Sequence, residues 1–274
     1  MGVYSKILKQ AYEITRQYSF LWIFGLFLSL VDVAAYSLVS IKGNQIKGYP
    51  NGYMSIGIIL ILIIFVLLSY RIKTALIIAI KAITDKQQIS SSKSFRSAKF
   101  FYGRVFNISL LMEVSNLILI LLVYVPVAYI SSHGQMVTAK LLGITGAVIL
   151  LPVAVTIILI KIIAPLFVVI YDQKINEAVN KSAGLITQSW QPVLCIGLIA
   201  FLLQMATLFL TLFVLKLASG TPLVSYILGT IVYVILESLV AVFCQTAWVL
   251  LFLDLIKPQK FETEQPVVAP EIAG

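Results

Sequence analysis

Long apolar stretches alternate with short polar ones along nearly the whole chain. A membrane-spanning helix needs about 20 mostly apolar residues in succession, and six regions reach that length. They are residues 19–41, 55–80, 106–131, 141–171, 193–215 and 223–253. A membrane β-barrel would show strands of about 10 residues in strict alternation, whereas runs such as 58–68 are continuously apolar. The pattern predicts an all-α integral membrane protein with about six transmembrane helices.

The polar stretches before the first and fifth spans have the period of an amphipathic helix. One apolar face consists of Tyr4, Ile7, Leu8, Ala11, Ile14 and Tyr18. The other consists of Ile175, Ala178, Val179, Ser182, Leu185 and Ile186. Such helices lie in the membrane interface with the apolar side down, or pack beneath the helix bundle. Both alternatives place these segments in the folded domain.

The chain matches itself without a gap when it is displaced by 172 residues. The matches least expected by chance are those of Gly48, Pro50, Gly57 and Thr74-Ala75 with Gly220, Pro222, Gly229 and Thr246-Ala247. A middle copy fits more loosely, with Tyr102 aligned to Tyr18 and Trp190. The self-similarity predicts one membrane domain over 1–256, built from three parallel repeats at about 4–86, 90–173 and 174–256. Each repeat would be an amphipathic cytoplasmic helix followed by a transmembrane hairpin.

The fourth span is longer than a bilayer requires. Residues 141–171 would form a helix of about 46 Å, against a hydrocarbon core of about 30 Å. Pro152 and Pro165 favour kinks within it, and we expect its excess length to meet the amphipathic helix of the next repeat. Residues 257–274 combine three prolines with scattered acids, which predicts a disordered cytoplasmic tail.

The positive charge lies mostly on one side of the predicted spans. Of the 20 Lys and Arg residues, 15 fall on the side of both termini and four on the other, while Lys161 lies within a span. Since positive loops stay cytoplasmic, both termini are predicted inside a multi-pass plasma-membrane protein. The chain is 60% hydrophobic with a mean hydropathy of +1.02, so membrane lipid, and not nucleic acid, is the expected partner of the formal charge of +9.

The chain offers little material for catalysis. Its single histidine, His133, falls in a predicted outer loop, and no phosphate-binding loop or metal-ligand spacing is present in the sequence. Cys195 and Cys244 fall within apolar spans, as small buried hydrophobic residues do, and not as a disulfide or metal pair. We therefore expect no enzymatic activity, no cofactor and no metal.

Six polar residues interrupt the apolar runs and are the candidate functional positions. They are Asp32, Glu113, Asn116, Lys161, Gln204 and Glu237. An ionisable group at the bilayer centre costs about 2.5–3.5 kcal/mol on insertion scales. Asp32, Asn116 and Gln204 occupy matching repeat positions, each 14 residues after an aromatic residue. They form either a polar pathway or ligand pocket, or interhelical hydrogen bonds worth about 0.6 kcal/mol each.

Two cations lie close to the inner ends of predicted spans. Arg71 and Lys161 either extend along the helix to the interface or, if Lys161 lies deeper, it pairs with a carboxylate. Glu113 and Glu237 are the expected partners in that second case.

Two stretches of the sequence resemble a known family. Ala164-Pro165-Leu166 through Ala178, Ser182, Trp190 and Val193 resembles a bacterial pattern in which a span ends, an acidic segment follows, and A-x-x-x-S with an aromatic leads into the next span. Residues 18–26 resemble the opening of the same proteins. These are uncharacterised six-helix membrane proteins related to the membrane domain of glycerophosphodiester phosphodiesterases. The resemblance covers most of 1–256 and implies a non-catalytic membrane domain, sometimes fused to a soluble phosphodiesterase.

Two functions follow from these patterns. The first is a non-catalytic membrane module that associates with lipid or organises a membrane or cytoplasmic protein partner. The alternative is a small-solute transporter or channel with a polar site at Asp32, Asn116 and Gln204, which would require a hydrated cavity joining them. The sequence leaves the oligomeric state open.

Overall fold

The computed structural model describes residues 3–43, 52–217 and 222–256, and in these residues every regular element is a helix. The elements are α1 (Val3–Gln17), α2 (Phe20–Gly43), α3 (Gly52–Thr84), α4 (Ser91–Ser97), the 3-10 turn η1 (Ala98–Phe100), α5 (Tyr102–Ser132), α6 (Met136–Tyr171), α7 (Ile175–Gln188), α8 (Trp190–Leu217) and α9 (Pro222–Ile256). The predicted spans fall within α2, α3, α5, α6, α8 and α9. The all-helical class is thus confirmed, and the predicted tail at 257–274 lies outside the described residues.

The long helices have the dimensions and composition of membrane spans. Five of them, within α3, α5, α6, α8 and α9, are long and apolar enough to cross a bilayer. α1 and the first part of α2 pass the same test only as a pair, with a bend of 95° between them. A helix satisfies all of its backbone hydrogen bonds internally, which lipid demands. The chain therefore has the architecture of a multi-pass helical membrane protein with five or six spans.

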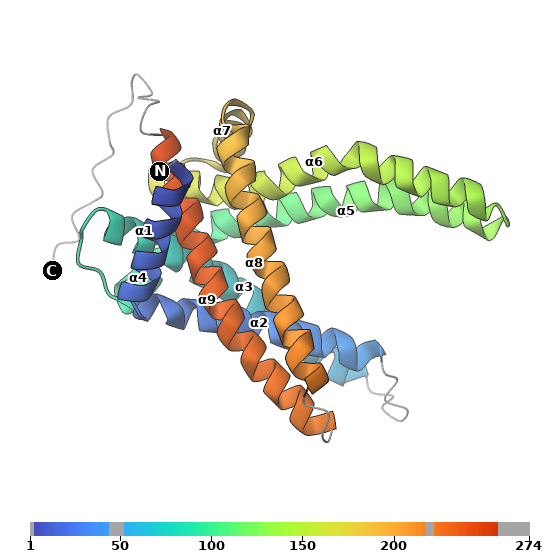
Figure 1. Cartoon of the computed structure of the whole chain (residues 1–274), viewed down its shortest axis with the longest axis horizontal. Helices are drawn as coiled ribbons and strands as arrows, with labels where there is room; N and C mark the ends of the chain where they lie inside the picture. The colour runs from blue at the N-terminus through green and yellow to red at the C-terminus, as the bar shows by residue number, and fades with distance from the viewer. Residues whose placement is uncertain (1–2, 44–51, 218–221, 257–274) are drawn as a thin grey trace.

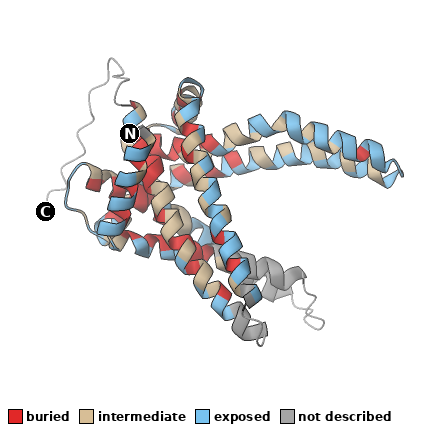
Figure 2. Cartoon of the chain, viewed as in Figure 1, coloured by how far each residue is buried: buried red, intermediate tan, exposed pale blue. Residues whose placement is uncertain are grey.

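The densest packing lies where three helix ends converge. The C-terminal parts of α3, α6 and α9 contact one another, and Figure 2 shows the buried residues gathered in this region, which we call the base. Ile80 on α3 is fully buried there. The rings of Phe167 and Phe252 meet edge to face with centroids 4.8 Å apart. Large apolar side chains from all three helices thus form a single core.

The three short helices surround this core in a regular order. α4 packs on α3, α7 packs on α6, and α1 packs on α9, so each contacts the long helix that precedes it when the chain is taken as a circle. The expected contact between the long fourth span and the next amphipathic helix is confirmed by α6 and α7. The predicted apolar faces are also the inner faces. Within them, Ile7, Ala11, Ile14, Ala178, Ser182, Leu185 and Ile186 are buried.

The three hairpins leave the base in different directions (Figure 1). α9 contacts both α8 and α2 over much of its length, whereas α5 and α6 contact mainly each other. Beyond the base, the α5–α6 hairpin is exposed along most of both helices (Figure 2). α6 runs unbroken from Met136 to Tyr171 with Pro152 and Pro165 inside it.

Helix bounds in the first and last thirds of the chain correspond closely. Subtracting 172 from the bounds of α7, α8 and α9 gives 3–16, 18–45 and 50–84, each within two residues of α1, α2 and α3. The buried face of α7 fits that of α1 better at a displacement of 171, because Ser182 and Leu185 then meet Ala11 and Ile14. One residue separates α7 from α8, whereas two separate α1 from α2.

Candidate functional site

Two of the predicted polar residues form an ion pair in the α5–α6 hairpin. The Lys161 ammonium on α6 donates to a carboxylate oxygen of Glu113 on α5. Glu113 is one of the two partners expected for a deep Lys161, and the two side chains do pair; the depth of Lys161 in the membrane stays a prediction. Lys161 lies ten residues before the end of α6 at Tyr171, or about 15 Å along the helix. The side chains are 30% and 53% exposed, so the pair lies on the surface of the hairpin.

Two more predicted residues join α8 to α9. The Gln204 amide donates a hydrogen bond to a carboxylate oxygen of Glu237, and only 5% of Glu237 is exposed. α2 contacts this part of α9, where the Ser29 hydroxyl donates to the Val234 carbonyl at 3.2 Å. Glu237 is therefore a buried acid at a junction of three helices, a position that a lone carboxylate in lipid could not sustain.

Close backbone approach accompanies this polar junction. A Cβ added to Gly25 on α2 would lie 2.3 Å from the Ser238 carbonyl oxygen and 2.7 Å from a methyl group of Val242. Only glycine fits between α2 and α9 at this point. Small residues at helix interfaces are typical of membrane bundles, so the junction has both of the features that hold such helices together.

The structure divides the six candidates differently from the repeat pattern. Four of them form two separate pairs on two hairpins: Lys161 and Glu113 are partly exposed, whereas in the other pair Glu237 is buried and Gln204 is exposed. Asn116 is half-buried on α5 and has no side-chain hydrogen bond to another described residue. The Asp32 side chain lies outside the described residues. A common site at Asp32, Asn116 and Gln204 therefore stays a prediction.

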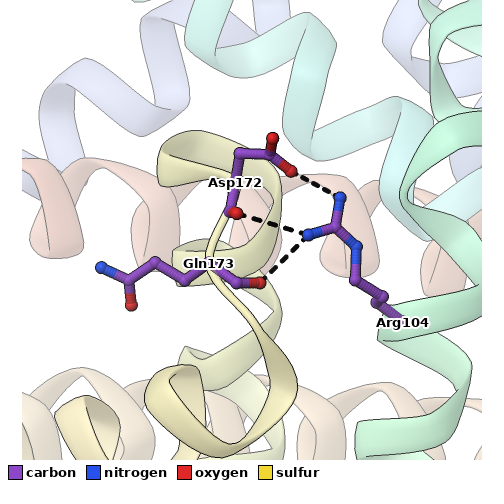
Figure 3. A network of polar contacts seen from close by, with 3 residues as sticks. All are labelled: Arg104, Asp172 and Gln173. Atoms are coloured by element: carbon purple, nitrogen blue, oxygen red, sulfur yellow. Dashed lines mark hydrogen bonds and ion pairs between the residues drawn. The ribbon is translucent and has the colours of Figure 1, made fainter. Parts of the chain in front are cut away.

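A polar clamp at the base was not expected from the sequence. Arg104, in the first turn of α5, donates to a carboxylate oxygen of Asp172 at 2.5 Å and to the carbonyls of Asp172 and Gln173 at 3.3 and 3.2 Å (Figure 3). Asp172 follows α6 in a left-handed conformation, with φ of 55°. Asp tolerates that conformation better than most residues. An Asp directly after a long apolar run is therefore the sequence feature that could have indicated the end of α6 and the clamp there.

The remaining chemistry of the described residues is sparse. No group of three or more His, Cys, Asp or Glu residues among them is arranged to hold a metal. Cys195 and Cys244 are both free thiols. His133 is exposed and lies against Tyr129, with ring centroids 4.4 Å apart. The expectation of a non-catalytic protein stays a prediction.

A small apolar depression lies at the base between α6, α7, α8 and α9. It is shallow and has no room for a water molecule. Its lining is Ile163, Leu185, Val193, Trp248, Leu251, Phe252 and Leu255. Because no polar group converges on this space, it lacks the donors and acceptors that orient a polar substrate.

Comparisons of the chain with protein-family models, curated proteins and solved structures find no match. What the fold defines is a class, the multi-pass helical membrane proteins. Any narrower assignment depends on the geometry of the base and of the two polar pairs.

Proposed function

We propose that the chain is a non-catalytic, multi-pass membrane module that associates with lipid through the ring formed by α1, α4 and α7. In this proposal it has six spans in three parallel repeats, with both termini on the cytoplasmic side of the plasma membrane. The observation that carries the proposal is the packing of the short helices α1, α4 and α7 on the long helices α9, α3 and α6. In this proposal the three short helices lie at one level, where the spans emerge from the membrane.

The outward faces of the ring support lipid association. Lys6, Lys9 and Arg16 are exposed on α1, opposite its buried face, and Lys93 and Arg96 are exposed on α4. The cytoplasmic leaflet carries anionic lipid, which attracts nearby Lys and Arg by about 1 kcal/mol each. The apolar faces of α1 and α7 pack on the bundle, so in this proposal the association with lipid headgroups depends on the exposed cations.

Matching positions in the first and last long helices support the repeat. Thr74 and Thr246 are both fully buried. Each hydroxyl donates to the carbonyl four residues earlier, at 2.8 Å to Tyr70 and 2.7 Å to Val242. The resemblance to membrane domains related to glycerophosphodiester phosphodiesterases agrees with this organisation and implies no catalytic role.

Cysteine labelling of intact cells tests the topology. With Cys195 and Cys244 replaced by alanine, single cysteines at Asn51 and Ser132 are expected to react with an impermeant reagent from outside. A cysteine at Ser92 is expected to react only after the membrane is opened. External labelling at Ser92 would contradict the six-span arrangement.

A depth measurement tests the lipid association itself. Tyr12 is 57% exposed on α1, so a fluorophore on Tyr12→Cys reports the surroundings of the ring. Quenching by lipids that carry a nitroxide near the headgroup is expected. A fluorophore quenched only by a water-soluble nitroxide would place the ring away from the membrane. The transport alternative requires a hydrated path that includes Asp32 and stays a second prediction.

A further inference from the structure

One sector of the ring differs from the other two in charge. The segment 86–104 carries Lys86, Lys93, Arg96, Lys99 and Arg104 and no Asp or Glu, a formal charge of +5. α1 carries three cations and one acid, which gives +2. Residues 174–188, with α7 and its N-cap, carry two cations and one acid, which gives +1. If the three sectors are equivalent by repeat, the positive charge is concentrated in one of them.

The packing of α4 and η1 on α3 leaves these cations on the outer surface. Ser94 and Ala98 are fully buried and turn one face of the segment onto α3. The Ser90 side chain caps α4 by accepting from the Lys93 backbone N–H at 3.3 Å. With that face fixed, Lys93, Arg96 and Lys99 are all exposed. None of the three has an ion-pair partner among the described residues.

A fourth cation lies beneath them. Arg71 on α3 stacks over the ring of Phe95, 4.2 Å from its centroid, and no described residue accepts a hydrogen bond from its buried Nε. Arg104 differs, because Asp172 already neutralises it. We call Arg71, Lys93, Arg96 and Lys99 the α4 corner.

An exposed aromatic residue lies beside these cations. Phe100 is 66% exposed, and the Lys99 ammonium lies 5.1 Å from its ring centroid. The long apolar helix α5 begins two residues later, at Tyr102. If α5 spans the bilayer, Phe100 lies at the interface, where aromatic rings are favoured. A soluble anion would make no use of an exposed phenyl ring at that level.

We infer that the α4 corner binds the headgroup of an anionic phospholipid in the cytoplasmic leaflet, with Phe100 inserted beside its acyl chains. Unpaired cations on one face match the phosphate charge, and the adjacent ring matches the hydrocarbon below it. This inference rests on the proposed function, since it places the ring at the membrane surface. It adds that one sector selects lipid by charge.

Lipid-specific quenching tests the inference on the full chain in vesicles. A bimane label is placed on Ser92→Cys, with Cys195 and Cys244 replaced by alanine, and either phosphatidylglycerol or phosphatidylcholine carries bromine on its acyl chains. We expect the phosphatidylglycerol to be preferred by about tenfold or more. The preference should fall as salt screens the charges.

Two charge-matched variants separate a site from a general surface potential. K93Q/R96Q/K99Q is expected to bring the preference close to one, whereas K6Q/K9Q/R16Q on α1 should leave it within about threefold of the original. Equal losses in both variants would overturn the inference. All six residues are exposed, and the single substitution Arg96→Gln, expected to weaken the preference in the same direction, serves if a triple variant fails to fold.

Phe100→Ser tests the apolar half of the site. It should weaken quenching by both lipids and leave their ratio unchanged, because the charges remain. Unchanged quenching in this variant would contradict the insertion of Phe100. Quenching without any lipid preference at Ser92 would overturn the inference and leave the proposed function intact. An absence of quenching both there and at a second label on Ser5→Cys of α1 would overturn both.

Discussion

The α8–α9 and α5–α6 hairpins carry similar polar pairs in different surroundings. Glu237 bonds Gln204 and is 5% exposed, whereas Glu113 bonds Lys161 and its side chain is 53% exposed. The difference is a third helix. α2 packs along α9, on which Glu237 is buried while Gln204 on α8 stays exposed. Among the described residues, no long helix packs in the same way along α5 and α6 beyond the base.

The comparison shows what brings helices together in this protein. Lipid tails are as apolar as leucine side chains, so association in a membrane depends on close packing and hydrogen bonds. Gly25 permits that approach between α2 and α9. The glycines of the α5–α6 hairpin serve its internal packing instead, since Gly143 and Gly146 face Val127 and Val123 of the same hairpin.

The largest effect is expected from filling the space at Gly25. Gly25→Ala would place a Cβ 2.3 Å from the Ser238 carbonyl, and because a backbone atom cannot rotate away, α2 must shift from α9. We expect a loss of about 3 kcal/mol, at the upper end of overpacking costs. Thermal unfolding in detergent measures it. Gly184→Ala on α7 is the control, because its Cβ would meet open space. Equal unfolding temperatures for the two variants would contradict the close contact.

The next effect compares the two acids directly. Glu237→Ala removes the hydrogen bond between a buried acid and the exposed Gln204 amide, at a cost of about 1–3 kcal/mol. Glu113→Ala releases a half-exposed Lys161, so the loss should be at most about 1 kcal/mol. Titration of the unfolding transition with SDS ranks the two, and Glu237→Gln, which keeps an acceptor, should lie close to the unsubstituted protein. A larger loss of stability in Glu113→Ala than in Glu237→Ala would contradict this comparison of the two acids.

Much of this architecture could be predicted from the sequence. Continuous apolar runs located the long helices because length alone distinguishes a span from a core helix. Helical spacing gave the inner faces of α1 and α7. The sequence also offered Glu113 as one of two partners for Lys161 if that cation lies deep in the membrane, because an unpaired cation there is costly. The contact of α7 with α6 could be predicted because α6 is longer than a bilayer requires.

The remaining features depend on rotation and register, which a sequence does not specify. Gln204 and Glu237 meet because of how α8 and α9 are turned about their own axes, although Gln204 had been grouped with Asp32 and Asn116 by spacing. The Arg104 clamp depends on the left-handed backbone of Asp172. The sequence does not reveal the one-residue difference in register between α1 and α7. Ile14 and Ile186 match at a displacement of 172 and are both buried, so the apolar pattern does not distinguish a displacement of 171 from one of 172.

A smaller effect is expected from loosening the base of the α5–α6 hairpin. Arg104→Ala removes three hydrogen bonds between the start of α5 and the end of α6, all partly solvated, for a loss of about 1 kcal/mol. Spin labels at Val148 on α6 and Leu198 on α8, both well exposed, should give a broader distance distribution by pulsed electron resonance. Lys81→Ala, which breaks only the local pair with Asp85 within 3.2 Å, should leave it unchanged. An equal broadening in both variants would contradict the claim that the Arg104 contacts hold the α5–α6 hairpin in its direction.

The smallest effect on stability, and the one that separates the two proposed functions, is expected at Asp32. The sequence places it at the repeat position of Asn116 and Gln204. If Asp32 only packs, Asp32→Asn keeps a polar partner and should change stability by less than about 0.6 kcal/mol. Asp32→Ala would then lose more, in a graded way. If Asp32 belongs to a transport path, both variants should stay folded while solute or proton flux into proteoliposomes disappears. Thermal unfolding and flux measured on the same two variants decide between these outcomes, because packing changes the first and a pathway changes the second.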